Sequence, residues 1–391
     1  MSACLSSPVA VLAARGGPVQ DYARARAEDL LAADLLVALA VVADPRHARG
    51  VRHRLVTVLA TAVCAVLAGA RAYVGIAEWA HDLPVSVRMR IGIGRRAPSE
   101  STFRRVLQSV DADELDRVVS GWLADRAAAA TAAGAVRAVA VDGKTARGSR
   151  TPQRAARHLF AAFDHSSGVV LGQSEVDDKT NEISAFAPLL DRIDITGTIV
   201  TADALHTQDR HANYLHERGA HYVFIVKNNR PRLRAQLAGL PWRDIPAADI
   251  TYDKGHGRVE SRTLKLTTIG SGIAFPHAKL AIQITRRRRA TGRWHTEAVY
   301  AVTDLGFSDI RPDQLTEIIR EHWSIENKLH WIRDVTFAED HCQIRTGNGP
   351  AVMATLRNFA LSRHRQAGAT NIAAACRHTS RHPIRAADLL T

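Results

Sequence analysis

The chain has 391 residues, of which 46% are hydrophobic, so it is long and apolar enough for two or three folded domains, and an intrinsically disordered chain is excluded. The 52 Lys and Arg residues outnumber the 39 Asp and Glu residues, which gives a net charge of +13. Such an excess favours a polyanionic partner such as nucleic acid, and a solvated basic surface is the alternative interpretation.

The cysteines and the apolar segments bear on the compartment. The four cysteines, Cys4, Cys64, Cys342 and Cys376, show neither metal-ligand spacing nor a disulfide framework, which indicates a reducing, cytoplasmic environment. The N-terminus lacks a basic segment followed by a clear apolar signal core. The apolar run at 55–70 is shorter than the ~20 residues that span a bilayer, so it predicts a buried helix and no membrane association.

The first third of the chain has a helical pattern. Residues 1–20 carry no clear pattern and predict a flexible arm, whereas 21–130 predict a helical N-terminal domain. Within it, Ser99 precedes a charged amphipathic run, which is typical of a helix start. Arg104 and Arg105 near the front of that helix are candidates to contact phosphates or a major groove, and a solvated basic helix is an equal alternative.

Two apolar runs lead to acidic residues. The run at 138–141 reaches Asp142 and predicts a buried strand with a carboxylate at its C-terminal tip, and the run at 198–202 reaches Asp203 in the same way. Carboxylates at the ends of two core strands can face each other, and a third acid, Glu326, is available on a helix. Three such acids are suitable ligands for hard divalent cations, and two ions can clamp the attacking and leaving oxygens of a phosphodiester.

The order of the remaining elements predicts a mixed α/β sheet, because the first three expected strands lack crossover helices. Strand patterns at 258–268, 280–285 and 296–303 predict a β-rich insertion with a basic lip at 286–289. We therefore divide the region after the helical domain as follows. The divisions are a first part of the core at 131–228, the insertion at 229–307, a second part of the core with the acidic helix at 308–360, and a basic tail at 361–391.

The acidic helix offers further candidates. His322, Glu326, His330 and Arg333 share one helical face, so His330 is placed to order a scissile group, with a buried structural histidine as an equal alternative. A Zn²⁺ site from His322, Glu326 and His330 is a rival interpretation that leaves the two aspartates unexplained. The two tryptophans of this helix, Trp323 and Trp331, have apolar neighbours in the sequence, which favours packing over base stacking.

Basic residues near these acids complete the expected DNA contacts. Lys144 and Arg147 belong to a basic loop that follows Asp142. The full set predicted to contact DNA is Arg104, Arg105, Lys144, Arg147, Lys227, Lys328 and Arg333.

Several motifs resemble those of the DDE transposases of bacterial insertion sequences, in particular the ISAs-type, or H-repeat-associated, branch. The most specific is His322-Trp323-Ser324-Ile325-Glu326-Asn327 with Leu329-His330-Trp331. The others are Val141-Asp142-Gly143-Lys144, Thr180-Asn181-Glu182-Ile183 and Ala202-Asp203-Ala204-Leu205-His206. The resemblance covers nearly the whole chain, although His322 and Arg333 stand where related transposases carry a Tyr-Arg-Glu-Lys pattern on the acidic helix.

The resemblance implies an RNase H-like catalytic core with a β-rich insertion, preceded by an all-α N-terminal domain. It also implies that Asp142, Asp203 and Glu326 are catalytic and hold two Mg²⁺ ions, for which Mn²⁺ can substitute. The implied reaction is cleavage of double-stranded DNA at the terminal repeats of an element, followed by strand transfer to target DNA. A homodimer in the synaptic complex and a nucleoid-associated location are the corresponding expectations. The alternative is an inactive or repurposed transposase-derived protein that only binds DNA.

Overall fold

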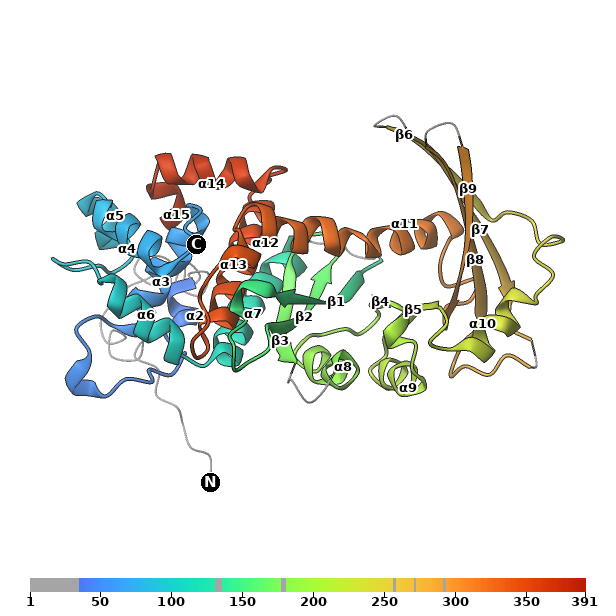
Figure 1. Ribbon diagram of the computed structural model, residues 1–391, viewed down its shortest axis with the longest axis horizontal. Helices are drawn as coiled ribbons and strands as arrows, with labels where there is room; N and C mark the ends of the chain where they lie inside the picture. Colours follow the sequence, from blue (N-terminus) through green and yellow to red (C-terminus); the bar gives the residue numbers. More distant parts are fainter. Residues whose placement is uncertain (1–34, 131–135, 177–180, 256–257, 271, 291–292) are drawn as a thin grey trace, which may run out of the picture.

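The computed structural model describes residues 35–130, 136–176, 181–255, 258–270, 272–290 and 293–391. The predicted arm at 1–20 lies outside the described residues, as does the start of the predicted helical region. Along its longest axis the molecule has a helical part, a central mixed sheet and a projecting group of long strands (Figure 1). The expected α/β fold with a preceding helical region is confirmed.

The helical part is built around one almost completely buried helix. Every residue of α3, Leu55–Leu67, is buried except Val56, as expected for a run of Leu, Val and Ala without charges. The neighbouring helices bury their own apolar faces in the same core. They are α2 Leu35–Leu39, α4 Tyr73–Asp82, α5 Val85–Arg90, α6 Glu100–Ser109 and α7 Ala112–Ala130, with a short 3₁₀ turn at Ala48–Gly50.

The C-terminal residues belong to the same helical part (Figure 1). Helix α13, Gly349–Gln366, packs against α3 and α7, and α14, Ile372–Arg381, and α15, Ile384–Asp388, follow it. The Leu35 N–H donates to the Leu390 carbonyl at 2.7 Å, which ties the first described helix to the end of the chain. The predicted basic tail is therefore helical and docked, because its apolar residues complete the core of the N-terminal helices.

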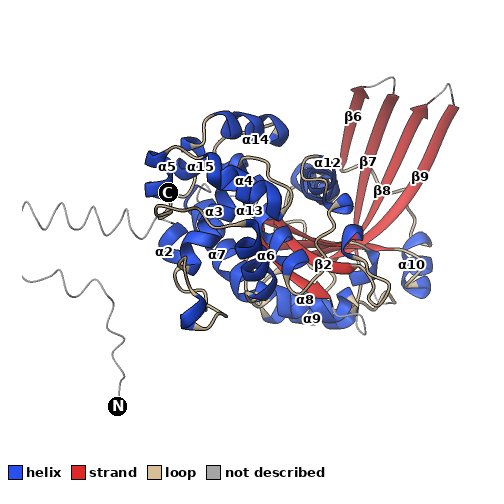
Figure 2. Cartoon of the chain, turned by 60° about the vertical axis from the view of Figure 1, so that its left-hand side comes forward, coloured by secondary structure: helices blue, strands red, loops and turns tan. Residues whose placement is uncertain are grey.

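The central sheet has the strand order β3-β2-β1-β4-β5. Strands β1 Ala138–Ala146, β2 Arg157–Asp164 and β3 Val170–Val176 are antiparallel, whereas β4 Ile199–Ala202 and β5 His221–Val226 run parallel to β1. Helices α8 Glu182–Leu190 and α9 Asp209–Glu217 lie on one face, and α11 Pro312–His322 crosses the other (Figures 1 and 2). Apolar residues on both faces of β1, β4 and β5 fill the two layers between sheet and helices.

The insertion continues this sheet instead of forming a separate unit. After α10, Pro231–Ala238, four antiparallel strands follow: β6 Asp249–Gly255, β7 Arg258–Thr268, β8 Leu280–Ala290 and β9 Arg293–Thr303. Because β9 pairs with β5, all the strands form one nine-stranded sheet. Strand β6 was not predicted, since only two of its residues, Ile250 and Tyr252, alternate with polar ones.

The acidic helix is not a regular α-helix throughout. A π-helical turn, Glu326–His330, lies between α11 and α12, Trp331–Val335, and a 3₁₀ turn, Glu339–His341, follows. Such turns insert an extra residue and are frequent at functional sites. Among the described residues, none of the helices combines the length and apolarity needed to cross a bilayer.

Candidate catalytic metal site

Asp142 lies on β1 at the point where one of its neighbouring strands ends. Pairing between β1 and the parallel strand β4 stops at Val141 and Ala202, whereas the antiparallel pairing with β2 continues to Ala146. Asp142 is therefore inside the strand and not at its tip, contrary to the prediction. Asp203 directly follows Ala202, so both aspartates lie at the same edge of the parallel part of the sheet.

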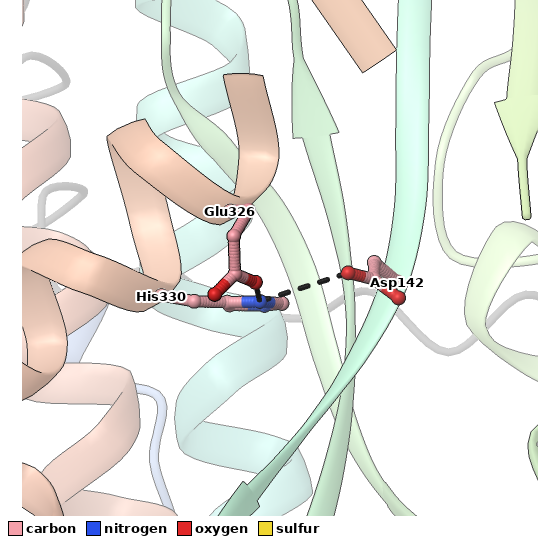
Figure 3. A group of neighbouring side chains, drawn as sticks. All are labelled: Asp142, Glu326 and His330. Atoms are coloured by element: carbon pink, nitrogen blue, oxygen red, sulfur yellow. Dashed lines mark hydrogen bonds and ion pairs between the residues drawn. The ribbon is translucent and has the colours of Figure 1, made fainter. Parts of the chain in front are cut away.

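The π-helical turn brings Glu326 and His330 to this edge (Figure 3). The His330 Nδ1 atom lies 3.0 Å from Glu326 Oε2 and 3.6 Å from Asp142 Oδ2. The three residues offer ligand atoms within 4.8 Å of one another. His330 is buried, Asp142 is half-buried and Glu326 is exposed, so the group has a solvent-accessible side.

The pKa of Asp142 is affected by its burial and by the charged groups around it. The pKa of Asp142 is raised to about 6, chiefly by burial. The negative charges of Glu182 and Asp203 contribute to the rise, and His330 and the Gly143 N–H oppose it. Asp203 therefore lies within electrostatic range of Asp142, although it is not one of the three residues grouped above. Its Oδ1 atom accepts the Leu205 N–H at 2.9 Å, which fixes the carboxylate at the start of a 3₁₀ turn.

The donor set fits a divalent cation. Carboxylate oxygens suit Mg²⁺ and Mn²⁺, and the imidazole of His330 adds a nitrogen donor that Mn²⁺ accepts more readily. The neighbouring carboxylates repel the negative charge of the partly buried Asp142 and so raise its pKa. A bound cation relieves this repulsion between carboxylates. The residues therefore fit one divalent cation between Asp142 and Glu326, and Asp203 lies at the same edge of the sheet.

The rival zinc site on a single helix is not assembled in the described chain. The His322 Nδ1 atom lies 3.0 Å from the Thr201 hydroxyl, and burial lowers the pKa of His322 to about 4, so its ring is neutral. His322 is not part of the group formed by Asp142, Glu326 and His330. It therefore fixes the helix to β4, which is the structural role left open by the sequence.

Glu182 is a site residue to which the sequence reasoning gave no role. Its carboxylate lies between His158 Nε2, at 2.6 Å, and His206 Nε2, at 3.2 Å. Burial raises the pKa of Glu182, but the hydrogen bonds and charges of the two histidines outweigh it and lower the pKa to about 2. The sequence signal for this role was the Thr180-Asn181-Glu182-Ile183 motif, because it contains the carboxylate whose charge acts on Asp142.

Gly143 is required by the close approach of Glu182 to β1. A Cβ at position 143 would lie 2.1 Å from Glu182 Oε1 and 2.5 Å from His158 Nε2. We expect Gly143→Ala to displace this pair and to cost about 1–3 kcal/mol of stability, the usual effect of overpacking. Urea unfolding of the full chain measures the loss. Gly94→Ala is the control, because nothing lies within 4 Å of a Cβ there, and equal effects for both substitutions would contradict the explanation.

Two of the predicted DNA contacts are engaged inside the protein. Lys144 Nζ lies 2.7 Å from Asp334 Oδ2, and its side chain is only 10% exposed. Arg333 is fully buried, with hydrogen bonds to Glu339 and Gln173. Both cationic groups face carboxylates and not solvent. Lys144 and Arg333 do not fit a phosphate-binding role in this arrangement, and we leave both out of the proposed DNA contacts.

The other predicted contacts lie at the surface. Arg105 and Lys227 are exposed, and the side chain of Arg147 is 81% exposed with its Nε atom 3.7 Å from Asp340. Arg104 pairs with Glu100 at 3.4 Å, and Lys328 pairs with Glu321 at 2.7 Å. Exposed pairs of this kind are weak and exchange readily for a phosphate.

The packing prediction for Trp323 and Trp331 is wrong. Trp323 is 62% exposed and Trp331 is 55% exposed, although the helix that carries them is otherwise well packed. The two indoles flank the turn that holds Glu326. Large exposed aromatic groups beside a candidate catalytic site are suited to contact a nucleic-acid substrate.

The mixed sheet, the carboxylates at the edge of its parallel strands and the acidic helix across it define an RNase H-like domain with an insertion before the acidic helix. The chain belongs to the Transposase DDE domain family, whose model matches residues 135–363. The model of the DDE_Tnp_1-associated region matches residues 36–123, which correspond to the helical N-terminal part.

Curated relatives agree with this assignment over most of the chain. "H repeat-associated putative transposase YhhI" of Escherichia coli K12 is 28% identical over 345 residues, which cover 84% of this chain and 89% of that protein. "H repeat-associated putative transposase YbfD" of the same strain is 29% identical and covers 58% of this chain and 91% of its own length. A piggyBac transposase synaptic complex with hairpin DNA aligns over 91% of this chain and 77% of its own, with a TM-score of 0.41 and 10% identity.

Proposed function

We propose that the protein is an active transposase of an insertion sequence, which cleaves double-stranded DNA at the ends of its element and joins the freed strand to target DNA. The observation that carries this proposal is the meeting of Asp142, Glu326 and His330 at the edge of the sheet, beside Asp203. Membership of the transposase DDE family supports it. A homodimer that pairs two element ends is part of the proposal.

The residues divide the work of the reaction. Asp142, Asp203 and Glu326 would hold two divalent cations. When bound, such ions activate water or a 3′-hydroxyl and stabilise the leaving 3′-oxygen in an in-line displacement at phosphorus. His330 Nδ1 hydrogen-bonds Glu326 and so orients that carboxylate toward Asp142.

The surface around the site would hold the DNA. Arg104, Arg105, Arg147, Lys227 and Lys328 supply the positive charge for phosphates, and Trp323 and Trp331 supply apolar faces. The test is incubation of the full chain with Mg²⁺ or Mn²⁺ and a DNA fragment carrying the ends that flank its reading frame. Cleavage at the element boundary supports the proposal, and tight binding without cleavage under end-pairing conditions favours a protein that only binds DNA.

The raised pKa of Asp142 predicts pH-dependent metal binding. With a pKa of about 6, Asp142 is protonated below this pH, and a carboxylic acid must lose its proton to bind the cation. We therefore expect Mn²⁺ affinity without DNA to fall about tenfold from pH 7 to pH 5. Calorimetric titration at both pH values measures it. An equal affinity at the two pH values would exclude Asp142 as a ligand with this pKa.

A further inference from the structure

Strands β6 to β9 project beyond the edge of the sheet at which the candidate catalytic residues lie. Strand β9 is antiparallel to β5, and its pairing with β5 ends where Val226 meets Tyr300. Residues 293–299 therefore continue past the C-terminal end of β5, which is parallel to β4 and β1. At about 3.3 Å per residue this overhang extends roughly 20 Å, and Figure 2 shows it standing clear of the helical part.

One face of the overhang, here called the inner face, continues the surface that packs on α11. Leu264, Ile282 and Ala301 of this face form a core with Leu315 and Ile318 of α11. Side chains alternate along a strand, so the strand register assigns each later residue to a face.

The inner face carries charges of both signs, and two of its acids form ion pairs. Glu260 forms ion pairs with Arg262 and Arg286, and Arg320 of α11 pairs with Asp253 at 3.0 Å. By register all four acids of strands β6 to β9 fall on this face. They are Asp249, Asp253, Glu260 and Glu297.

The opposite, outer face of the overhang is basic and aromatic. By register it carries Arg287 and Arg289 of β8, Lys254 of β6, Trp294 of β9 and Tyr252, and it carries none of the four acids. All five side chains are exposed, with Tyr252 at 80% and Trp294 at 49%. The Arg287 guanidinium lies 5.2 Å from the centre of the Trp294 ring, which keeps the charge at the surface.

We propose that this outer face, defined by Tyr252, Lys254, Arg287, Arg289 and Trp294, binds the phosphate backbone of duplex DNA that leads away from the catalytic edge. Three cations without an acid on their face are electrostatically complementary to a row of phosphates, and the aromatic rings pack against sugars. About six base pairs span the 20 Å of the overhang at 3.4 Å per pair. The inference rests on the proposed function, because it extends the DNA path from that site.

The strand offers a matched pair of variants for the test. Arg287→Gln with Arg289→Gln removes two outer charges, and Arg286→Gln with Arg288→Gln removes two inner charges from the same strand. Fluorescence anisotropy of the full chain measures binding to a 30-base-pair duplex of unrelated sequence in a salt series without divalent ions. We expect the outer variant to bind at least about tenfold more weakly, with a salt slope smaller by about two, and the inner variant to keep the slope of the unmodified chain.

Equal salt slopes for the outer and inner variants would overturn the inference, provided that circular dichroism shows both to be folded. Trp294→Ala gives a second measure, because it keeps all charges and should weaken binding without changing the slope. A concentration-dependent dimer that only the outer variant loses, with unchanged DNA affinity, would assign the face to a second copy and also overturn the inference. A failure of the proposed function gives a different result: the unmodified chain would still bind this duplex but would show no metal-dependent cleavage.

Discussion

A Glu326→Gln protein should bind element-end DNA as tightly as the unmodified chain and cleave it at least about 10³-fold more slowly. The substitution keeps the shape of the side chain but removes the charge that lies 3.0 Å from His330 and next to Asp142. A 10³-fold slower cleavage corresponds to about 4 kcal/mol of transition-state stabilisation, which is the size of effect expected when a metal ligand is lost. Single-turnover cleavage with Mg²⁺, measured beside an anisotropy titration of the same DNA, separates chemistry from binding.

The same helix supplies the control for this prediction. Glu321→Gln makes an identical chemical change five residues earlier, at a carboxylate that pairs with Lys328 and lies outside the candidate metal group. It should leave cleavage within a few-fold of the unmodified rate. Asp142→Asn and Asp203→Asn should behave as Glu326→Gln does. Cleavage at an undiminished rate by the Glu326→Gln protein would remove Glu326 from the proposed site.

Local patterns predicted the strands that carry the acids, because a buried strand needs an uninterrupted apolar run. The run before Asp142 and the run before Asp203 both became core strands, and the range 258–268 matches β7. The continuity of β9 with β5 is different, since it depends on pairing between segments about 80 residues apart that no local pattern records. Strand β6 was missed for a different reason: it is short and rich in polar residues, and its pairing with β7 and the ion pair of Asp253 with α11 hold it in place.

The acidic helix shows the limit of periodicity. A period of 3.6 residues puts Arg333 on the face of Glu326, but the π-helical turn at Glu326–His330 changes the phase and buries Arg333 completely. The exposure of Trp323 and Trp331 was missed for another reason, because an apolar sequence environment does not reveal which face a neighbouring element covers. Asp142, Asp203, Glu326 and His330 were thus candidates from the sequence, and the geometry added Glu182.

The burial of Arg333 belongs to a network that fixes the acidic helix in place. Glu339 receives hydrogen bonds from Arg333 Nε at 2.7 Å and from Arg357 Nη1 at 2.9 Å, and all three side chains are at most 2% exposed. Arg333 also donates to Gln173 on β3. The network therefore joins the helix of Glu326 to α13 and to the far edge of the central sheet.

Replacing Glu339 by Gln should cost about 3–5 kcal/mol of unfolding free energy, because it leaves two buried guanidinium groups without a counter-charge. Asp340→Asn is the control: Asp340 is a more exposed neighbour, 3.7 Å from Lys144, and its loss should cost at most about 1 kcal/mol. Urea unfolding measures the loss of stability in each variant, and a cleavage assay measures the activity that each retains. Equal losses for the two variants would contradict the structural role of the network.

The pH dependence of this difference follows from the ionisation of Glu339. Burial raises the pKa of Glu339, but the charges and hydrogen bonds of the two arginines outweigh it and lower the pKa to about 2. A carboxyl whose pKa is lower in the folded than in the unfolded state adds stability above its unfolded value, near 4.3, and loses it as the pH falls toward 2. The stability gap between the unmodified chain and Glu339→Gln should thus be largest near neutral pH and narrow below pH 4. In this account the negative charge of Glu339 holds the helix that carries Glu326 in place, and protonation at low pH removes that charge. A stability gap that stays constant down to pH 3 would mean that Glu339 acts through packing alone.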